Sequence, residues 1–164
     1  MNPIEIGAGS VRAVPFRELA PGEICVAGDR LFVRANREGA PEAVCIVDFA
    51  DATLRPMAFD SLGNRTVLTL AGWTPVVTLR ERAPHDLVTA EDTGSVVVLA
   101  NGPWLICQTA GPAYARTVQI LDLQSGEIRY AGDGVQGVIF SDWSWVAKLP
   151  DGEPWELLSW PTQR

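Results

Sequence analysis

Apolar and polar residues alternate through most of the chain, and the clearest alternation occurs twice. Residues 22–34 read as two short apolar strands around a Gly-Asp pair, and residues 94–108 repeat this arrangement around an Asn-Gly pair. Alternating strands joined by such a tight turn are the sequence signature of a β-hairpin. A hairpin that occurs twice predicts that a larger strand-rich unit is duplicated.

Further apolar segments follow each hairpin in the same order. After the first hairpin they are residues 42–49, 54–59, 66–70 and 74–79, and after the second they are residues 116–123, 127–130, 135–140 and 143–149. Gly, Pro, Asn and Asp lie at the joints, and no stretch has the 3.6-residue periodicity of a helix. The spacing between corresponding segments drifts slowly, as loop insertions and deletions produce, which indicates a diverged repeat.

This pattern predicts an all-β protein built from two tandem, related small barrels of the SH3-like or OB-like kind, packed together. The predicted units are a first module with an N-terminal lead-in (1–82), a linker (83–93), a second module (94–150) and a tryptophan-containing C-terminal tail (151–164). The alternative is one fused β-sandwich or barrel, because a module this small buries little surface alone.

One stretch of the first module has a recognisable order of residues. It consists of Val14-Pro15-Phe16-Arg17-Glu18-Leu19, Pro21-Gly22-Glu23-Ile24, Gly28-Asp29-Arg30-Leu31-Phe32-Val33 and Glu42-Ala43-Val44. This order, over about a third of the chain, is similar to short phage and prophage modules in which Phe, Leu and Gly precede a hydrophobic hairpin. Phe32 and Arg34 stand where those modules usually have Tyr and Lys. The resemblance implies a viral or mobile-element origin and transfers no activity.

The charge balance bears on the choice of partner. The chain carries 20 acidic against 13 basic residues, a formal net charge of -7 at pH 7, and its arginines are scattered. Binding to nucleic acid depends on clustered Lys and Arg that displace counterions from phosphates. We therefore expect no nucleic-acid partner and assign the acidic surplus to solubility.

The sequence predicts neither a standard signal segment nor a membrane span. The first ten residues hold one acid and no base, unlike the basic start of a secretory signal. The longest apolar stretch, residues 95–107, is too short and too interrupted to cross a bilayer. We expect a soluble protein that has no membrane partner and is not secreted by a standard signal.

Cys25, Cys45 and Cys107 are an odd number without a CxxC pair. This usage fits a reducing compartment and neither a disulfide framework nor a zinc site, so we expect the protein in the cytoplasm or in a virion. All three lie in apolar strand patterns, so we expect buried cysteines that act as small hydrophobic residues.

Few residues suggest chemistry. Residues 132–137 match GxGxxG, but a phosphate-binding loop needs a helix after it, and residues 138–140 continue as strand. His85 is the only histidine and lies in the predicted linker. Asp48 and Asp122 occupy equivalent strand ends, where Asp commonly accepts backbone N–H groups. The sequence thus predicts no catalytic residue, no cofactor and no metal site.

Tryptophan is the most informative residue type, because six are many for 164 residues. Four fall near the C-terminus, and the two-residue period places two of them on one strand face. They either cap the second module's core or form an exposed interface for a protein partner. The predicted interface residues are Trp143, Trp145, Trp155, Leu158 and Trp160.

These observations favour a non-enzymatic structural or adaptor protein that acts through contacts with another protein or with its own copies. Its expected setting is a phage or prophage, as a virion or accessory component. The alternative is a small-ligand or glycan-binding β module that uses exposed tryptophans, and an enzyme comes third. The first predicts tryptophans at a chain interface, and the second an open aromatic groove.

Overall fold

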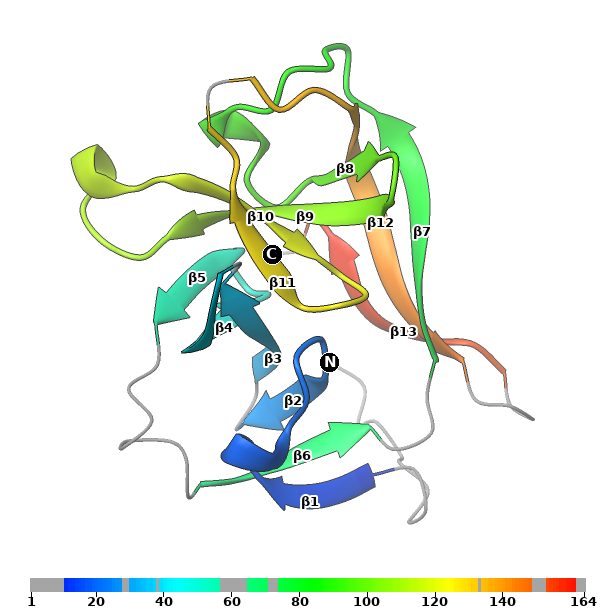
Figure 1. Cartoon of the computed structure of the whole chain (residues 1–164). Coiled ribbons are helices and arrows are strands. Elements are labelled where there is room, and N and C mark those ends of the chain that lie inside the picture. The colour runs from blue at the N-terminus through cyan, green and yellow to red at the C-terminus, as the bar shows by residue number, and fades with distance from the viewer. Residues whose placement is uncertain are drawn as a thin grey trace.

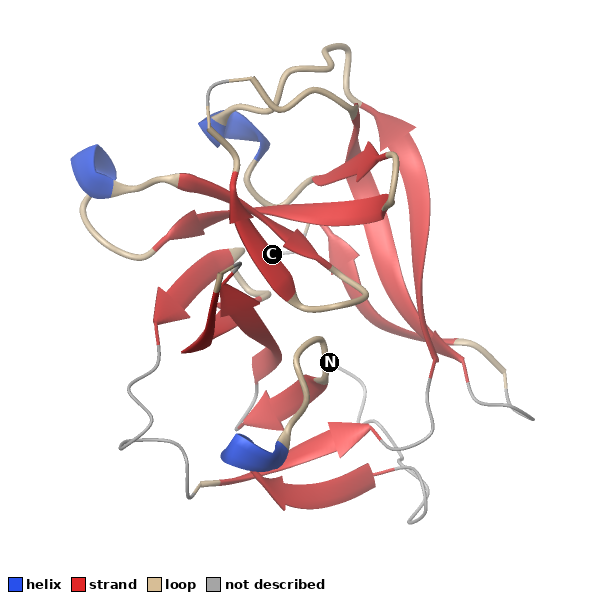
Figure 2. Cartoon of the chain, viewed as in Figure 1, coloured by secondary structure: helices blue, strands red, loops and turns tan. Residues whose placement is uncertain are grey.

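The computed structural model describes residues 11–27, 30–37, 39–56, 65–70, 74–132, 134–148 and 153–161. Strands dominate this part of the chain, and the helices within it are three single turns of 3-10 helix (Figure 1, Figure 2). The predicted all-β class is confirmed.

The first half of the chain contains seven of the strands. They are β1 (Val11–Pro15), β2 (Ile24–Ala27), β3 (Arg30–Arg37), β4 (Ala40–Asp48), β5 (Thr53–Pro56), β6 (Thr66–Leu70) and β7 (Thr74–Arg82). The second half contains β8 (Val96–Leu99), β9 (Gly102–Thr109), β10 (Val118–Asp122), β11 (Glu127–Tyr130), β12 (Val138–Lys148) and β13 (Trp155–Trp160). The helical turns are η1 (Phe16–Glu18), η2 (Ala90–Asp92) and η3 (Ala113–Ala115).

Both predicted hairpins form, as β2 with β3 and β8 with β9. The two strands predicted at residues 135–140 and 143–149 are instead one long strand, β12. The polar Asp142 suggests a break, but the register shifts beside it in the pairing with β7, and its carboxylate binds the Arg80 guanidinium at 2.9 Å. A strand can continue through such an irregularity when the polar side chain has a partner.

Six strands pair in a closed circuit. β3 pairs with β4, β4 with β5, β5 with β9, β9 with β10, β10 with β11, and β11 returns to β3. We call these six strands the strand ring. The sheet as a whole remains open, because β1, β6 and β2 extend it on one side and β8, β12, β7 and β13 on the other (Figure 1).

Two parallel pairings, β5 with β9 and β11 with β3, join the two halves of the chain. The expectation of two tandem small barrels is therefore not confirmed, since strands of both halves share one mixed sheet. Neither half keeps a sheet of its own because each parallel pairing satisfies strand edges that would otherwise be exposed.

The hairpins of the two halves begin with the same backbone contact. The Gly22 N–H donates to the Arg34 carbonyl at 2.7 Å, and 72 residues later the Gly94 N–H donates to the Ile106 carbonyl at 2.8 Å. Both glycines have a positive φ, of 84° and 93°. The local geometry of the two hairpin starts is thus the same, as expected where the sequence pattern recurs.

The two parallel junctions are also reciprocal. The Asn36 N–H donates to the Gly126 carbonyl at 2.8 Å, and the Gln108 N–H donates to the Ala52 carbonyl at 3.1 Å. Ala52 and Gly126 both adopt left-handed backbone, with φ of 52° and 72°. Each half therefore closes the ring on the other with the same turn geometry.

The main core lies inside the strand ring and continues under β12. Ring strands contribute buried apolar side chains to it: Val33, Ala35, Val47, Leu105, Cys107, Leu121 and Ile128. Phe49 packs edge-on against Trp145 in the same cluster, with ring centroids 5.0 Å apart. Burying each Val, Leu, Ile or Phe side chain of this cluster contributes about 1.5 to 3 kcal/mol, and such burial is the main stabilising term.

Candidate binding site at one mouth of the strand ring

The directions of the six ring strands determine which strand ends lie together. β3 is parallel to β11 and β5 is parallel to β9, whereas β4 and β10 run antiparallel to their neighbours. The C-terminal ends of β3, β5, β9 and β11 therefore meet the N-terminal ends of β4 and β10 at one end of the ring. Barrel mouths are common places for binding sites.

At this end the inward-facing positions change from apolar to polar. Side chains two residues apart on a strand share a face, and so do directly paired residues. On β3, β9 and β11 the inward-facing residues are apolar until the last one, which is Arg37, Thr109 or Tyr130. On β10, which runs the other way, Gln119 lies nearer this end than the buried Leu121. We call Arg37, Thr109, Gln119 and Tyr130 the ring mouth.

A hollow of about 410 Å³ opens at the ring mouth, and we call it the mouth cavity. The residues that line it are Arg37, Thr117, Gln119, Ile128, Arg129 and Tyr130. Ile128 is fully buried, whereas Tyr130 is 65% exposed. The cavity thus has an apolar base and a polar, accessible rim, which is the usual composition of a binding site.

Hydrogen bonds hold part of this rim in place. The Gln119 Nε2 donates to Thr117 Oγ1 at 3.0 Å, and the Thr117 N–H donates to Thr109 Oγ1 at 2.9 Å. Gln119 is buried, and its bond to Thr117 fixes the orientation of its amide. The rim between β9 and β10 is therefore ordered without a ligand.

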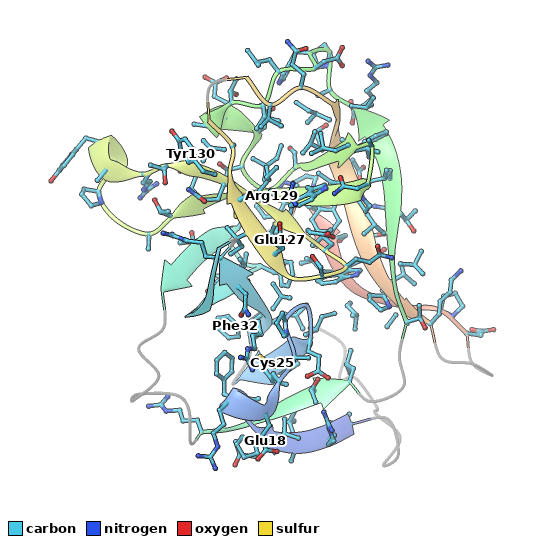
Figure 3. The ribbon with its side chains drawn as sticks, viewed as in Figure 1. Glu18, Cys25, Phe32, Glu127, Arg129 and Tyr130 are labelled. Carbon is cyan, nitrogen blue, oxygen red and sulfur yellow. The ribbon has the colours of Figure 1, made fainter. Side chains whose placement is uncertain are left out.

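The two arginines of the mouth cavity differ in their contacts. The Arg129 Nε contacts Glu127 Oε1 at 2.6 Å, and its guanidinium carbon lies 4.9 Å from the centroid of the Trp104 ring. Figure 3 shows Glu127, Arg129 and Tyr130 along β11. Arg37 is exposed at the end of β3 and has no ion pair or side-chain hydrogen bond within the described ranges. Its charge is thus available to a ligand.

The loop between β9 and β10 projects beside the ring mouth (Figure 1). The Arg116 Nε donates to the Gly111 carbonyl at 2.8 Å, and the Ala115 N–H donates to the Pro112 carbonyl at 2.9 Å. Tyr114, in the helical turn η3, is 93% exposed. The loop is therefore closed by internal bonds and holds an aromatic side chain in solvent.

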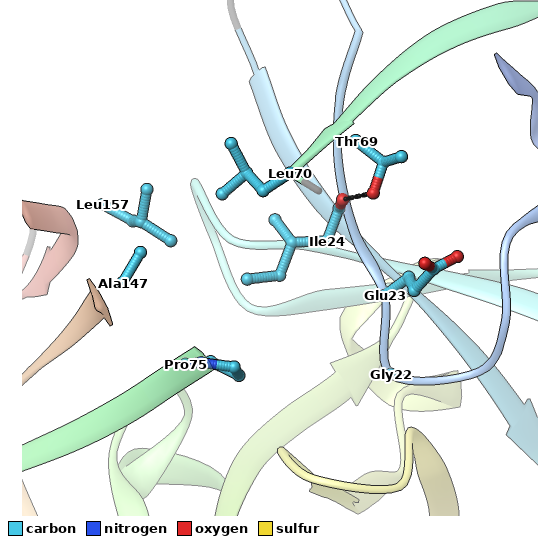
Figure 4. Close-up of a pocket in the computed structure, with 8 residues that line it drawn as sticks. All are labelled: Gly22, Glu23, Ile24, Thr69, Leu70, Pro75, Ala147 and Leu157. Carbon is cyan, nitrogen blue, oxygen red and sulfur yellow. Dashed lines mark hydrogen bonds between the residues drawn. The ribbon is translucent and has the colours of Figure 1, made fainter. Parts of the chain in front are cut away.

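A smaller cavity, of about 230 Å³, lies where β2 and β6 face β12 and β13 (Figure 4). Leu70, Ala147 and Leu157 contribute apolar groups to it, and Thr69 Oγ1 donates to the Ile24 carbonyl at 2.9 Å. Glu23 also lines this cavity, and its Oε2 accepts the Ala20 N–H at 2.7 Å. Both polar side chains thus already contact the main chain, so this cavity offers less to a polar ligand than the mouth cavity does.

Two of the tryptophans predicted for an interface lie in the core. Trp143 is 0% exposed and its Nε1 donates to the Gly94 carbonyl at 2.7 Å, and Trp145 is 1% exposed and packs on Phe49. Buried rings at these positions correspond to the expectation that the tryptophans cap a core. A partner cannot reach them on the surface of this structure.

The other predicted interface residues belong to β13, which forms part of the predicted tail. Leu158 pairs with Trp145 and Trp160 with Trp143 across β12 and β13, and both side chains are half-buried. The side chain of Trp155 lies outside the described part of the structure. The tail therefore packs back on the sheet as an added strand.

Other residues singled out in the sequence have structural contacts. The Asp48 and Asp122 carboxylates accept backbone N–H groups two residues on, at 3.0 and 2.8 Å. His85 Nε2 lies 2.8 Å from Asp92 Oδ1, while Asp92 Oδ2 accepts the Thr89 N–H at 2.8 Å to cap η2. These carboxylates thus order turns and a helix start.

The GxGxxG match at residues 132–137 leads into β12, so strand follows the loop as expected; residue 133 lies outside the described part. Over the described ranges, no cluster of three or more His, Cys, Asp or Glu is placed to hold a metal ion. The same part of the chain contains no helix with the length and apolar character needed to traverse a membrane.

Cys25 and Cys107 are buried and form no disulfide within the described residues, whereas the side chain of Cys45 is outside the described part. Burial, helped by the Glu23 carboxylate, raises the pKa of Cys25 from 9.0 to about 12. Only the thiolate reacts readily. In a Cys45→Ala background we expect neither remaining thiol to react with Ellman's reagent near neutral pH until denaturant is added, and reaction of the folded protein would contradict the described burial.

The same pKa makes stability depend on pH. Because the folded pKa of Cys25 exceeds the unfolded one, its contribution is complete below pH 9.0 and is lost progressively as the pH rises towards about 12. We expect Cys25→Ala to flatten the alkaline fall in the free energy of unfolding, measured by urea titration. An unchanged slope would contradict the raised pKa.

Sequence reasoning did not select Arg37, Gln119 or Tyr130. Each lies at a strand end and is ordinary in its local pattern. The signal is that all three face the inside of a ring, which requires the strand pairing to be known. No protein-family model matches the chain, and no curated protein or solved structure matches it significantly.

Proposed function

We propose that this protein is a non-enzymatic structural or adaptor protein that acts through protein–protein contacts, with the β9–β10 loop at its contact surface. The observation that carries the proposal is Tyr114, which is 93% exposed at the tip of that loop. Tyrosine is among the side chains most enriched at binding hot spots.

The loop is suited to this role because it is ordered in advance. The contacts of Arg116 with Gly111 and of Ala115 with Pro112 close it on itself. A loop that is already ordered loses less conformational entropy when a partner binds. An exposed aromatic ring on such an ordered loop is therefore better suited to bind a partner than one on a flexible loop.

The other function classes have less support. The alternative of a glycan-binding module needs exposed tryptophans, whereas Trp104, Trp143 and Trp145 are buried. The carboxylates of Asp48 and Asp122 accept turn N–H groups, and His85 contacts Asp92, which caps η2. These contacts support a binding role over a catalytic one.

We further infer a phage or prophage virion as the setting and a duplicated unit as the origin of the chain. The first rests on the resemblance of residues 14–44 to phage modules. The second is supported by backbone hydrogen bonds that recur about 72 residues apart. Co-sedimentation of the protein with particles induced from its source would test the setting, and its absence from those particles would contradict it.

Photo-crosslinking tests the contact surface. The photoreactive amino acid p-benzoylphenylalanine replaces Tyr114 in one variant and exposed Glu81, on β7, in a control variant. Illumination in an extract of the source should link position 114 to one protein species, this chain or another, identified by mass spectrometry. Absence of an adduct, or the same adducts from position 81, would contradict the proposal.

Alanine replacement of Tyr114 should then weaken binding of the cross-linked species by about tenfold or more, as expected for an aromatic hot spot. The ring is exposed, so the melting temperature should stay within about 2 °C of the parent protein. Unchanged affinity would exclude Tyr114 as the anchor of the contact.

A further inference from the structure

We propose that the mouth cavity binds a carboxylate of an acidic peptide segment and that Arg37 pairs with it. The identity of the segment rests on the proposed function, since it would belong to the protein partner. The cavity, of about 410 Å³, is large enough for one or two side chains.

The first support is the charge of Arg37. It lies where β3 and β11 part, beside the buried Ile128 with which it is paired, and it has no ionic partner within the described ranges. By contrast, Arg80 contacts both Asp142 and Glu156. A guanidinium presents its donors in a fork that matches a carboxylate.

The second support is the set of polar groups around this charge. Gln119 and Tyr130 are direct partners across β10 and β11, so their side chains lie on the same face as Arg37. The hydrogen bond from Gln119 to Thr117 fixes the orientation of the Gln119 amide. Fixed polar groups beside a cation can orient a bound acid. This distinguishes a binding site from an isolated charged residue on the surface.

The third support is the asymmetry of the strand ring. At the spacing of 72 to 74 residues that relates the recurring contacts, the positions equivalent to Arg37, Gln119 and Tyr130 hold other residues. They are Thr109, Cys45 and Pro56. Because the other half forms its share of the ring with no charged side chain at these three positions, the fold does not require a cation there. A role in binding accounts for the presence of Arg37 on one side.

The net charge of the chain also limits which class of anionic ligand can bind. The chain as a whole carries -7, so a long polyanion such as nucleic acid would be repelled by most of the surface. A short acidic segment can reach a local cation without meeting that field along its length. The expected ligand is therefore a segment with one or two carboxylates aimed into the mouth.

The probes are two synthetic peptides, acetyl-(Gly-Glu)3-amide and acetyl-(Gly-Gln)3-amide, titrated into the full-length, ¹⁵N-labelled protein. The first should shift the Arg37 Nε–Hε signal and the backbone amides of Gln119 and Tyr130 saturably, and added salt should weaken it. The glutamine peptide should bind at least tenfold more weakly. Equal binding of the two peptides would overturn the proposal.

Variants provide the matched controls. Arg37→Gln should weaken binding of the acidic peptide by about tenfold, and Arg37→Lys should restore it in part, because lysine keeps the charge but loses the fork. Arg65→Gln removes the same charge from an exposed position before β6 and should leave binding unchanged. Equal losses from Arg37→Gln and Arg65→Gln would show a general charge effect and overturn the assignment.

Titration with glutarate distinguishes the source of the carboxylate. If glutarate binds as tightly as the acidic peptide, the mouth is a small-acid site and the proposed segment is wrong. The titrations need no natural partner, so their result is independent of cross-linking at position 114. Peptide binding without any cross-linked protein would contradict the proposed contact surface alone.

Discussion

Replacing Gly126 with alanine is expected to lower the free energy of unfolding by more than about 3 kcal/mol, because two penalties combine. The residue has a φ of 72°, where an L side chain is strained. A methyl carbon added there would overlap the Gly22 backbone nitrogen and lie 2.8 Å from the Gly22 Cα. The two glycines face each other across the junction of the halves, so relief requires β11 to move away from the β2–β3 hairpin.

Gly39→Ala is the matched control. Gly39 has the same φ of 72°, but an added methyl carbon would meet no atom within 4 Å. The Gly39→Ala substitution should lower the free energy of unfolding only by the backbone strain, about 1 kcal/mol. Urea unfolding of both variants isolates the packing effect at the junction. Equal losses would mean that the close approach of Gly126 to Gly22 does not contribute.

Replacing Trp143 with alanine is expected to destabilise the fold by about 3 to 5 kcal/mol, the usual cost of truncating a fully buried aromatic residue. The ring is 0% exposed, and its Nε1 bonds to the Gly94 carbonyl at 2.7 Å. Trp143→Phe keeps most of the apolar volume and removes this donor, so it should cost less, about 1 to 3 kcal/mol.

Tyr114→Ala is the control for this series, because it removes an aromatic side chain that is 93% exposed and should change stability by less than about 0.5 kcal/mol. Urea unfolding measures all three variants. If Trp143→Ala left stability unchanged and altered only association with another chain, Trp143 would be an interface residue and the core described here would be wrong.

The strand class and much of the strand order could be predicted because alternation is a local property. The hairpins β2–β3 and β8–β9 follow from residues that are neighbours in sequence. The parallel pairings that close the ring join segments more than 50 residues apart, and no periodicity records which edges meet. Separate barrels were therefore the simpler expectation.

The tryptophans also show that a local pattern does not reveal long-range packing. Period two places Trp143 and Trp145 on one face of a strand, but it does not say what covers that face. In the structure β12 is paired with β7, β8 and β13, and both rings pack into the main core. Likewise, Arg37 becomes a candidate only once its strand is known to line a ring.

The closure of the strand ring bears on how the chain folds during synthesis. β3 and β5 are made early, yet their parallel partners β11 and β9 come from the second half. Until that half emerges from the ribosome, both strands keep edges able to pair with other chains. Such long-range pairing also slows folding. Expression at low temperature, which slows aggregation of half-made chains, should therefore raise the yield of native protein more than a stronger promoter does.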